Sequence, residues 1–490
     1  MQKKMDTPFP IEKLRLVTGP DEEIIRGGRS LFNLLGTAFT GVKQIGVIGW
    51  GSQGPAQSQN LRDSLASVGS DIKVVMGLQA GSGSVSKAKE AGFSSDNGTL
   101  GEMYGVVSKS DLVILLISDG GQTEVYPEVF AAMKPGSTLG LSHGFLEGYL
   151  SGIGGVFPSN INVVMVAPKG MGPSVRRLYL QGKDTGGSGI NSSVAIHQDV
   201  TGSASRIATG WSVAIGSPVT FQTTIPMEWR SDLFGERAIL LGGMWGMLEA
   251  LYKHFLKHGK SEEFSFEQSV LALTSFISPQ ISKLGLDGFY QQHVQGRYEG
   301  PFVNGYASAY LSFRTVMERI YENVSSGQEI SDVVIATREL KNHPMPSIEL
   351  EPMWQVGKRV RESGKRITEM EKCAAFTAGV YVAGVMEQFR LLRSKGHCIS
   401  EIVNESLIEG TDSLTPFMDA RGVAYMADNC SITARLGTRR YGPEFQESIS
   451  HYIGLGLTHL EFPYDWLSDI IHRDVATCYQ YKPSVSIVTA

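Results

Sequence analysis

The stretch that decides the fold runs from residue 45 to residue 65 and reads IGVIGWGSQGPAQSQNLRDSL. It joins a short apolar strand to a helical stretch, Ala56–Leu65, through the turn Gly49-Trp50-Gly51-Ser52-Gln53-Gly54. The three glycines of this GxGxxG pattern allow a tight turn, so that N–H groups at the helix start can hold a pyrophosphate. The strand–turn–helix context makes the pattern far more specific than an isolated GxGxxG. These six residues are therefore predicted to bind a dinucleotide; the alternative is a glycine-rich turn that binds nothing.

Further apolar runs of strand length alternate with helical or glycine-rich segments up to about residue 220. This alternation predicts a doubly wound α/β sheet of the Rossmann type over residues 1–225. From residue 226 to residue 490 long stretches with helical periodicity replace the strands, which predicts an all-α second domain. The expected strands are Gln44–Ile48, Ile72–Leu78, Asp111–Ser118, Ser137–Ser142 and Ile161–Ala167, and the clearest expected helices are Glu236–Lys257, Ser308–Val324 and Phe376–Lys395.

The composition is that of an ordinary globular enzyme with more than one domain. The chain has 490 residues, 42% of them hydrophobic and 19% charged, and a net charge of −5. Without a long basic or apolar run it offers little to nucleic acid or to a membrane. Its four cysteines form no CxxC pair, and residues 1–23 resemble neither a signal nor a transit peptide. We therefore expect a cytoplasmic protein with a small-molecule substrate.

The helical part contains a weak internal repeat at a shift of 138 residues. Five identities keep their spacing under this shift, and Gly246, for example, falls on Gly384 (246 + 138 = 384). Chance similarity between two amphipathic helices is the alternative, but we favour a duplicated helical unit. The other matching pairs are Glu249 with Glu387, Lys257 with Lys395, Glu263 with Glu401, and Glu267 with Glu405.

The loop after the second predicted strand bears on the choice of dinucleotide. Enzymes that use NAD place an acid there to accept from the ribose 2′-hydroxyl. Here the loop carries Gln79, Ser82 and Ser84, and the first acid is Glu90. Hydroxyl groups suit a 2′-phosphate, which favours NADPH, although a solvated Ser/Gly loop would have the same sequence.

Two acidic patterns in the helical part suggest a metal site. Glu228, Asp232 and Glu236 follow one another at intervals of four, as do Glu401 and Glu405, so each set shares one helix face. Like charges so placed repel each other and call for a cation or for solvent. Carboxylates without neighbouring His or Cys favour Mg²⁺. A solvated helix face is the common alternative for any single acidic pair.

Two more side chains follow predicted strands of the sheet. His143 lies in LSHGF and Lys169 in PKGMGP, each just past a strand end. The carboxyl ends of such strands are where α/β sheets bind ligands. Both residues are therefore candidate catalytic groups, and structural roles are the alternative.

Seven segments taken together closely resemble the ketol-acid reductoisomerase family, and the resemblance covers nearly the whole chain from Gly27 onward. It implies a long form of the family, in which the helical unit is duplicated and knotted, and it implies that Glu263 and Glu267 are relics of a ligand pair. The segments are IGVIGWGSQGPAQSQNLRDSL, LSHGF, PKGMGPSVRRLY, SDLFGER, FTAGVYVAGVMEQ, SEIVNES and DNCSITARLG.

The resemblance also implies an activity: Mg²⁺-dependent alkyl migration in 2-acetolactate or 2-aceto-2-hydroxybutyrate, then reduction by NADPH, in valine, isoleucine and leucine biosynthesis. It implies two Mg²⁺ ions held by Asp232, Glu236, Glu401 and Glu405, and 2-hydroxy-3-keto acid substrates. A homo-oligomer, dimer or tetramer, is expected. The remaining implied roles are substrate positioning by Glu228 and Ser431, catalysis by His143 and Lys169, 2′-phosphate binding by Ser82 and Ser84, and cofactor contact by Ser118, Asp119 and Gln122.

One departure from the family concerns the phosphate loop, which commonly carries a basic residue where this chain has Gln79. Loss of that charge-assisted contact predicts a weakened preference for NADPH. Two rival hypotheses are a metal-independent NADP-dependent β-hydroxyacid dehydrogenase and a non-catalytic NADP-binding regulator. The paired acidic helices argue against the first, and the retention of every candidate site residue argues against the second.

Overall fold

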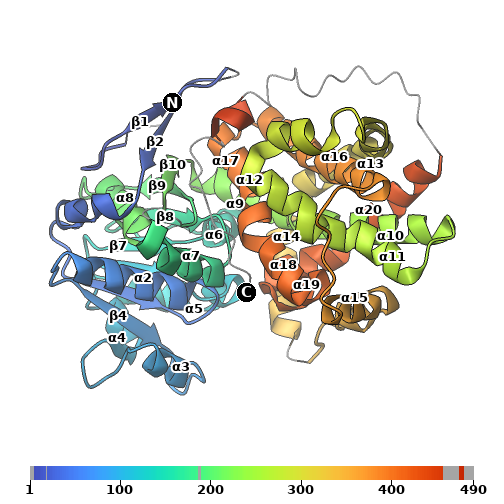
Figure 1. Ribbon diagram of the computed structural model, residues 1–490. Coiled ribbons are helices and arrows are strands. Elements are labelled where there is room, and N and C mark those ends of the chain that lie inside the picture. Colours follow the sequence, from blue (N-terminus) through green and yellow to red (C-terminus); the bar gives the residue numbers. More distant parts are fainter. Residues whose placement is uncertain (1–4, 18, 186–188, 341, 456–473, 479–490) are drawn as a thin grey trace.

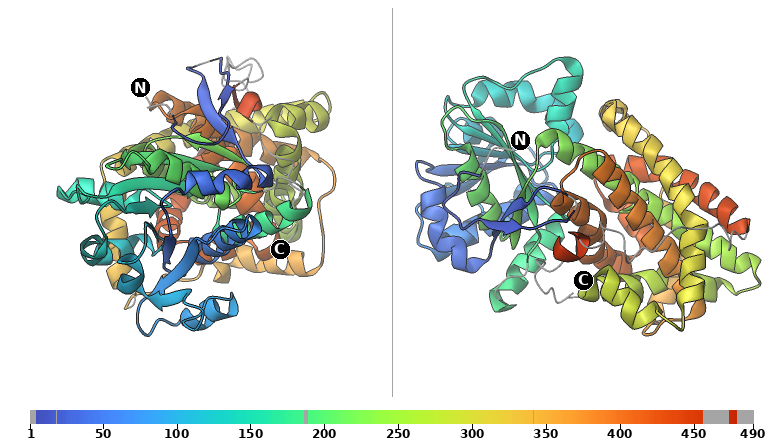
Figure 2. Two further views of the ribbon diagram at one scale, coloured as in Figure 1. Left: turned by 90° about the vertical axis from the view of Figure 1, so that its left-hand side faces the viewer. Right: turned by 90° about the horizontal axis from the view of Figure 1, so that it is seen from above.

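The computed structural model describes residues 5–17, 19–185, 189–340, 342–455 and 474–478, and it divides into a sheet with flanking helices and a bundle of helices (Figures 1 and 2). All strands of the described chain form one sheet in the order β1-β2-β10-β9-β8-β7-β6-β3-β4-β5. The strands are β1 (Glu12–Leu14), β2 (Glu22–Arg26), β3 (Gln44–Ile48), β4 (Lys73–Leu78), β5 (Leu100–Glu102), β6 (Leu112–Leu115), β7 (Thr138–Leu141), β8 (Asn162–Pro168), β9 (Ser192–Gln198) and β10 (Val219–Gln222).

Strands β3 to β8 form the parallel core of the sheet, as the apolar runs predict. Neighbours β3 and β4, β3 and β6, and β7 and β8 all pair in parallel. The chain order reverses between β3 and β6, which creates the switch point where such sheets bind ligands. The sheet continues through β9, which pairs antiparallel with β8 and parallel with β10, to the antiparallel hairpin β1–β2. This extension is absent from our prediction, and β1 and β2 in particular are short and largely charged.

Helices cover both faces of the sheet, so that side chains alternate between two cores along each strand. Ile45 and Val47 of β3 face α2 (Gln53–Ser67) and α8 (Ala204–Ala214), whereas Ile48 and Leu115 belong to the core on the other face. The helices of that other face are α4 (Met103–Val107), α5 (Asp119–Ala132) and α6 (Phe145–Ile153). The remaining helices of this half are η1 (Arg29–Leu34), α1 (Leu35–Ala38), α3 (Val85–Glu90) and α7 (Gly172–Thr185).

The second half is helical, which confirms the predicted fold class. We divided the chain between residues 225 and 226; strand β10 ends at Gln222 and α9 begins at Ile225. The helices are α9 (Ile225–Arg237), α10 (Gly242–Lys257), α11 (Glu262–Phe266), η2 (Glu267–Leu271), η3 (Leu273–Ile277), α12 (Ser278–Phe289), η4 (Tyr290–Val294), α13 (Glu299–Ser325), α14 (Gln328–Glu339), η5 (Ile348–Leu350), α15 (Pro352–Glu362), α16 (Lys372–Ser394), α17 (Ile399–Val403), η6 (Asn404–Ile408), η7 (Gly410–Leu414), α18 (Thr415–Arg421), α19 (Val423–Asn429) and α20 (Ile432–Gly454).

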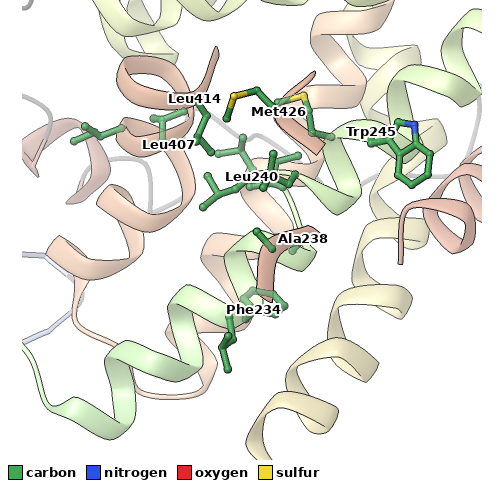
Figure 3. Close-up of a cluster of buried hydrophobic side chains, with 14 of the residues drawn as sticks. Phe234, Ala238, Leu240, Trp245, Leu407, Leu414 and Met426 are labelled. Carbon is green, nitrogen blue, oxygen red and sulfur yellow. The ribbon is translucent and has the colours of Figure 1, made fainter. Parts of the chain in front are cut away.

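The prediction of one continuous helix over Glu236–Lys257 is wrong, because the chain breaks between α9 and α10. Ala238 leaves the helical region at φ −92°, ψ −125°, and α10 starts four residues later at Gly242. The apolar residues of the break pack into the core instead of continuing the helix. Figure 3 shows Ala238 and Leu240 beside Leu407 and Leu414, which come from η6 and η7. The residues of the break therefore hold the segment that carries Asp232 in contact with the segment that carries Glu405.

The internal repeat is visible as two copies of one series of elements. Each copy has a short α-helix, two π-helical turns and a helix that ends or bends at a glycine with positive φ. These glycines are Gly285 (φ 73°) and Gly422 (φ 106°). The copies are intertwined, because α10 of the first packs on α20 of the second while α13 packs on α16. The knot itself stays a prediction.

Among the described residues, no helix is both long enough and apolar enough to cross a membrane.

Candidate active site

The GxGxxG turn joins β3 to α2 at the switch point of the sheet. Gly49 has a φ of 104°, and a Cβ on Gly54 would lie 2.2 Å from the carbonyl oxygen of Gly49, so both positions require glycine. A Cβ on Gly51 would meet nothing closer than 3.6 Å, which leaves its backbone facing the adjacent cavity. Trp50 does not point along the turn but packs edge-on against Phe93.

Ser52 and Gln53 connect this turn to the loop that follows β8. The backbone N–H of Gly172 donates to the Ser52 hydroxyl (3.2 Å), and Nε2 of Gln53 donates to the carbonyl oxygen of Gly170 (2.9 Å). The dinucleotide turn and the loop that follows Lys169 are therefore held in one fixed arrangement.

A cavity of about 230 Å³ lies at the carboxyl ends of β3, β6 and β7. It brings together half of the residues predicted to contact the cofactor, together with His143 from the sheet and Ser431 from the helical half. Its predicted cofactor residues are Gly51, Ser52, Gln53, Ser118, Asp119 and Gln122. The sheet and the helical bundle thus meet at the predicted nicotinamide end of the site.

The predicted 2′-phosphate loop follows β4, the strand next to β3, so it lies at the same edge of the sheet. The Gln79 side chain is exposed, and the backbone N–H of Ser84 donates to the Ser82 hydroxyl (3.2 Å). No acidic side chain occurs between Leu78 and the start of α3, in keeping with the sequence pattern.

Helix α9 presents Glu228, Asp232 and Glu236 toward the sheet. The helix starts where the Thr224 hydroxyl accepts from the N–H of Met227 (3.3 Å), with Pro226 in its first turn. Glu228 is buried, and it accepts a hydrogen bond from the backbone N–H of Gly144 (2.7 Å). This contact fixes the carboxylate against the loop after β7.

His143 lies between two carboxylates of α9 and also lines the cofactor cavity. Its Nδ1 is 3.3 Å from Oε2 of Glu228 and 3.3 Å from Oδ2 of Asp232. Burial acts to lower the pKa of His143, but the charges of Asp232 and Glu228 outweigh it and hold the pKa well above its usual value. His143 is therefore a cation here, placed between the cofactor cavity and the acidic cluster.

Lys169 bridges the two halves of the molecule from inside the cluster. Its Nζ donates to Oε1 of Glu405 and lies 3.5 Å from Oε1 of Glu228. Burial acts to lower the pKa of Lys169, but Glu405 and Glu228 raise it well above the usual value. The ammonium therefore keeps its proton and serves as a fixed positive charge.

Glu401 differs from the other predicted ligands because both oxygens of its carboxylate accept hydrogen bonds from side chains of the protein. The Thr223 hydroxyl donates to Oε2 (2.6 Å), the Ser231 hydroxyl donates to Oε1 (2.9 Å), and both contacts are buried. Nδ1 of His397 lies 3.7 Å from Oε2. Burial acts to raise the pKa of Glu401, but the His397 imidazole and Lys169 outweigh it and lower the pKa. Glu401 as a metal ligand stays a prediction, and in this structure its carboxylate oxygens accept hydrogen bonds from the protein.

Glu409 joins the acidic cluster, although it is missing from the sequence-based candidates. Burial and the nearby charges of Glu405 and Asp232 raise its pKa well above the usual value. The signal was present in the sequence, since Glu409 continues the four-residue spacing of Glu401 and Glu405. In the repeat its counterpart is Leu271 (409 − 138 = 271), so the first copy has lost this acid.

Four carboxylates interact electrostatically with one another in this cluster. They are Asp232, Glu236, Glu405 and Glu409. Burial first, and then like charge, raises the pKa of each of them, and that of Glu405 to about 7. Oε2 of Glu405 and Oε2 of Glu236 are buried and accept no hydrogen bond in the described part of the chain. Buried carboxylate oxygens without donors, repelling one another, form a favourable site for a hard divalent cation.

Ser431 lies at the edge of this cluster, at the start of α20. Its hydroxyl accepts from the N–H of Ala434 (3.0 Å) and lies 3.5 Å from Oε1 of Glu236. The residue therefore adjoins both the acidic cluster and the cofactor cavity, as expected of a group that holds substrate.

The N-terminal hairpin supports the cluster from a distance of almost 400 residues in sequence. Glu22 of β2 accepts hydrogen bonds from the backbone N–H groups of Ile399 (2.6 Å) and Ser400 (3.1 Å), at the start of α17. A carboxylate is favourable at that end of the helix. The sequence alone could not predict this contact, because nothing in the segment EEIIR indicates that Glu22 lies at the start of α17.

The pair Glu263 and Glu267 lies apart from the acidic cluster. Glu263 is 56% exposed and 3.9 Å from the guanidinium of Arg359, while Glu267 pairs with Nζ of Lys365 (2.6 Å). Each acid has a cationic partner of its own, which agrees with their interpretation as relics.

Comparisons with known proteins identify both halves of the chain. Residues 40–220 match the family model described as acetohydroxy acid isomeroreductase, NADPH-binding domain, and residues 226–365 match that of the ketol-acid reductoisomerase C-terminal domain. The chloroplastic ketol-acid reductoisomerase of Spinacia oleracea is 49% identical, over 98% of this chain and 82% of that protein. The chloroplastic enzyme of Pisum sativum is 48% identical, over 98% and 84%. A solved structure of an NADH-preferring ketol-acid reductoisomerase from an uncultured archean shares the fold, with a TM-score of 0.55 and 24% identity over 65% of this chain and 94% of that one.

Proposed function

This chain belongs to the ketol-acid reductoisomerase family of NAD(P)-binding oxidoreductases in branched-chain amino-acid biosynthesis. We propose that it rearranges 2-acetolactate or 2-aceto-2-hydroxybutyrate in a Mg²⁺-dependent reaction and then reduces the product with NADPH. The observation that carries the proposal is the cluster of four carboxylates with raised pKa values beside the dinucleotide cavity. A metal-independent dehydrogenase would have no use for such a cluster.

Asp232, Glu236, Glu405 and Glu409 are the residues that would hold two divalent cations. Asp232 interacts electrostatically with the carboxylates of both segments, so it would help to hold the cations together with Glu236, Glu405 and Glu409. Glu409 takes the place that the sequence analysis gave to Glu401. Bound cations would supply the positive charge that favours loss of the substrate hydroxyl proton and polarises the neighbouring carbonyl.

Lys169 and Glu228 are buried charged residues that would line the substrate site. Lys169 holds its proton at Nζ, and it can therefore donate to a substrate carboxylate or hydroxyl but cannot act as a base. The charges of His143 and Lys169 outweigh the effect of burial and lower the pKa of Glu228, which stays ionised and can accept a hydrogen bond from the substrate. Since both residues are buried, water has little access to the reacting groups.

Ser431 and His143 orient the substrate relative to the cofactor. Ser431 lies at the first turn of a 23-residue helix, where a substrate carboxylate is electrostatically favoured and its hydroxyl can donate. His143 touches the cluster on one side and the cavity on the other, so it can donate to an oxygen at the carbon that receives the hydride. A dinucleotide bound at residues 49–54 would supply that hydride.

NADPH is proposed as the preferred nucleotide because the loop after β4 offers Ser82 and Ser84 and no acid. The preference is expected to be modest, since Gln79 provides no positive charge. The archaeal enzyme that prefers NADH belongs to the same fold. A homo-oligomer and the absence of nucleic-acid or membrane partners stay predictions, and so does a cytoplasmic location; the spinach and pea relatives are named as chloroplastic.

The metal assignment is tested by comparing Glu409→Gln with Glu401→Gln. Binding of Mn²⁺, monitored by electron paramagnetic resonance, and acetolactate-dependent NADPH oxidation with Mg²⁺ are measured for both variants. Glu409→Gln should lose tight binding of at least one ion and nearly all isomerisation. Glu401→Gln should keep both ions, because Glu401 acts through hydrogen bonds within the protein. The opposite pattern would restore Glu401 as the ligand.

A further inference from the structure

A second cavity lies far from the acidic cluster, where the carboxyl ends of α10 and α20 meet the amino ends of α13 and α16. Its volume is about 870 Å³, within the range of sites for small molecules. Helix α20 separates it from the active site, because Ser431 precedes the first residue of that helix and Gly454, at its other end, lines the cavity. The 23 residues of α20 span about 34 Å at roughly 1.5 Å per residue.

The lining of this cavity, which we call the basic pocket, is strongly cationic. It contains no aspartate or glutamate in the described part of the chain, although acids outnumber bases in the chain as a whole. Of its lysines, only Lys253 has a carboxylate partner among the described residues, Glu249 at 3.5 Å. The basic side chains are Lys253, His254, Lys257, His258, Lys260 and Lys372.

The positive charge of the basic pocket comes mainly from its lysines. The rings of His254 and His258 lie 4.3 Å apart. Burial and the neighbouring His258 and Lys257 lower the pKa of His254 to about 4. Helix α16 begins at Lys372, and no described side chain hydrogen-bonds to the N–H groups of its first turn, although its N-cap residue is Glu371.

The basic pocket also has a flat apolar wall. The His254 ring stacks on Phe376 with an interplanar angle of 9° and centroids 5.5 Å apart. Pro301 and Ile453 complete the apolar surface. A site with several lysines around an aromatic floor suits a ligand that has both a phosphate group and a planar or apolar part.

We propose that the basic pocket is a binding site for a small phosphorylated compound, distinct from the dinucleotide site. Lys257, Lys260 and Lys372 would contact the phosphate oxygens, while the His254–Phe376 wall would contact the remainder of the molecule. An anion of charge −2 or more would reduce the mutual repulsion of the lysines, since no acidic side chain among the described residues lines the pocket.

The test measures binding of inorganic pyrophosphate by calorimetry to the full-length protein, with NADPH saturating the dinucleotide site. Lys257→Glu with Lys372→Glu is compared with Lys43→Glu with Lys283→Glu, a matched double charge reversal at exposed lysines outside the basic pocket. The pocket variant should bind roughly tenfold or more weakly, and the control should bind like the wild type. Lys257→Gln with Lys372→Gln, a milder change, should weaken binding in the same direction.

Three results would overturn the proposal: no saturable binding to the wild type, equal weakening in the pocket and control variants, or binding that disappears when NADPH is added. The last result would place pyrophosphate in the dinucleotide site. Acetolactate-dependent NADPH oxidation should be unchanged in the pocket variant, which checks that it is folded and keeps this test independent of the metal assignment.

Discussion

The Thr433 hydroxyl, at the start of α20, donates a hydrogen bond to Oδ2 of Asp119, at the start of α5. This contact joins the helical bundle to the sheet directly across the cofactor cavity, which both residues line. The cavity of about 230 Å³ is below the roughly 300–1,000 Å³ of sites for drug-sized ligands. We therefore expect the two halves to separate at this contact when a dinucleotide enters.

Replacing Thr433 by valine should favour the open arrangement. Valine keeps the shape of threonine but cannot donate to Asp119, and the Asp119 carboxylate can then be solvated by opening. We expect faster association of NADPH in stopped-flow fluorescence, with the free energy of unfolding lowered by about 1 kcal/mol. Thr433→Ser, which retains the donor, is the matched control. An association rate that is the same in all three proteins would mean that this contact does not limit entry.

Asp232→Asn should abolish isomerisation and leave part of the reduction of a simple 2-keto acid. The reason is that alkyl migration depends on two cations bridged by this carboxylate, whereas hydride transfer depends on them less. Both half-reactions are measured separately with NADPH. Equal loss of the two activities would leave the two-step assignment without support, and normal isomerisation would contradict the metal site altogether.

The double variant Glu263→Ala with Glu267→Ala should retain nearly full activity and Mg²⁺ affinity. Both acids pair with exposed cations, Arg359 and Lys365. The Glu263–Arg359 pair is exposed on both sides, and such pairs contribute about 0–1 kcal/mol to stability, whereas the Glu267 side chain is largely buried. Activity is titrated against Mg²⁺ for this variant and for Glu405→Ala with Glu409→Ala, the equivalent pair in the other copy. A collapse of Mg²⁺ affinity in the first variant, with the fold intact, would show that the copies are assigned the wrong way round.

Gln79→Arg should increase the preference for NADPH over NADH. Gln79 is exposed at the end of β4. An arginine there could bind the 2′-phosphate through two hydrogen bonds from its charged guanidinium group, which glutamine cannot do. The added charged hydrogen bonds are worth about 1–2 kcal/mol, or roughly tenfold in selectivity. The measurement is kcat/KM for both nucleotides in wild type and variant. A wild type that prefers NADH, or unchanged selectivity, would show that residue 79 does not face the phosphate.

Protein stripped of metal with EDTA should lose stability as the pH rises from 6.5 to 8. Burial chiefly, together with Asp232 and Glu228, raises the pKa of Glu405 from 4.5 to about 7, so the folded state binds more protons than the unfolded state in this range. His143, whose pKa is also raised, contributes in the same direction. The lowered pKa of His254, about 4, contributes the opposite slope only below pH 6.5.

Urea unfolding at several pH values measures this effect. Glu405→Gln, which cannot titrate, should reduce the slope, and added Mg²⁺ should raise stability most at pH 8, where the carboxylates are ionised. A stability that rises with pH in the stripped wild type would contradict the electrostatic description of the cluster.

The sequence by itself determined the α/β domain, the turn at residues 49–54 and the acidic face of α9. These features depend on local chemistry: a strand, a glycine turn and a four-residue spacing are readable from neighbours along the chain. Strands β3 and β4 and helices α13 and α16 were located for the same reason. The repeat was also visible, because a duplication leaves identities at a constant shift.

Only the tertiary structure decided which acids accept hydrogen bonds from the protein and which face other acids. Glu401 and Glu409 are equally acidic in sequence, but Thr223 and Ser231 donate to Glu401, whereas Glu409 faces Glu405 and Asp232. The break at Ala238 and the cap that Glu22 provides are decided in the same way, by partners up to several hundred residues away. Burial and hydrogen bonding are properties of the packed chain, so no local spacing rule can predict them.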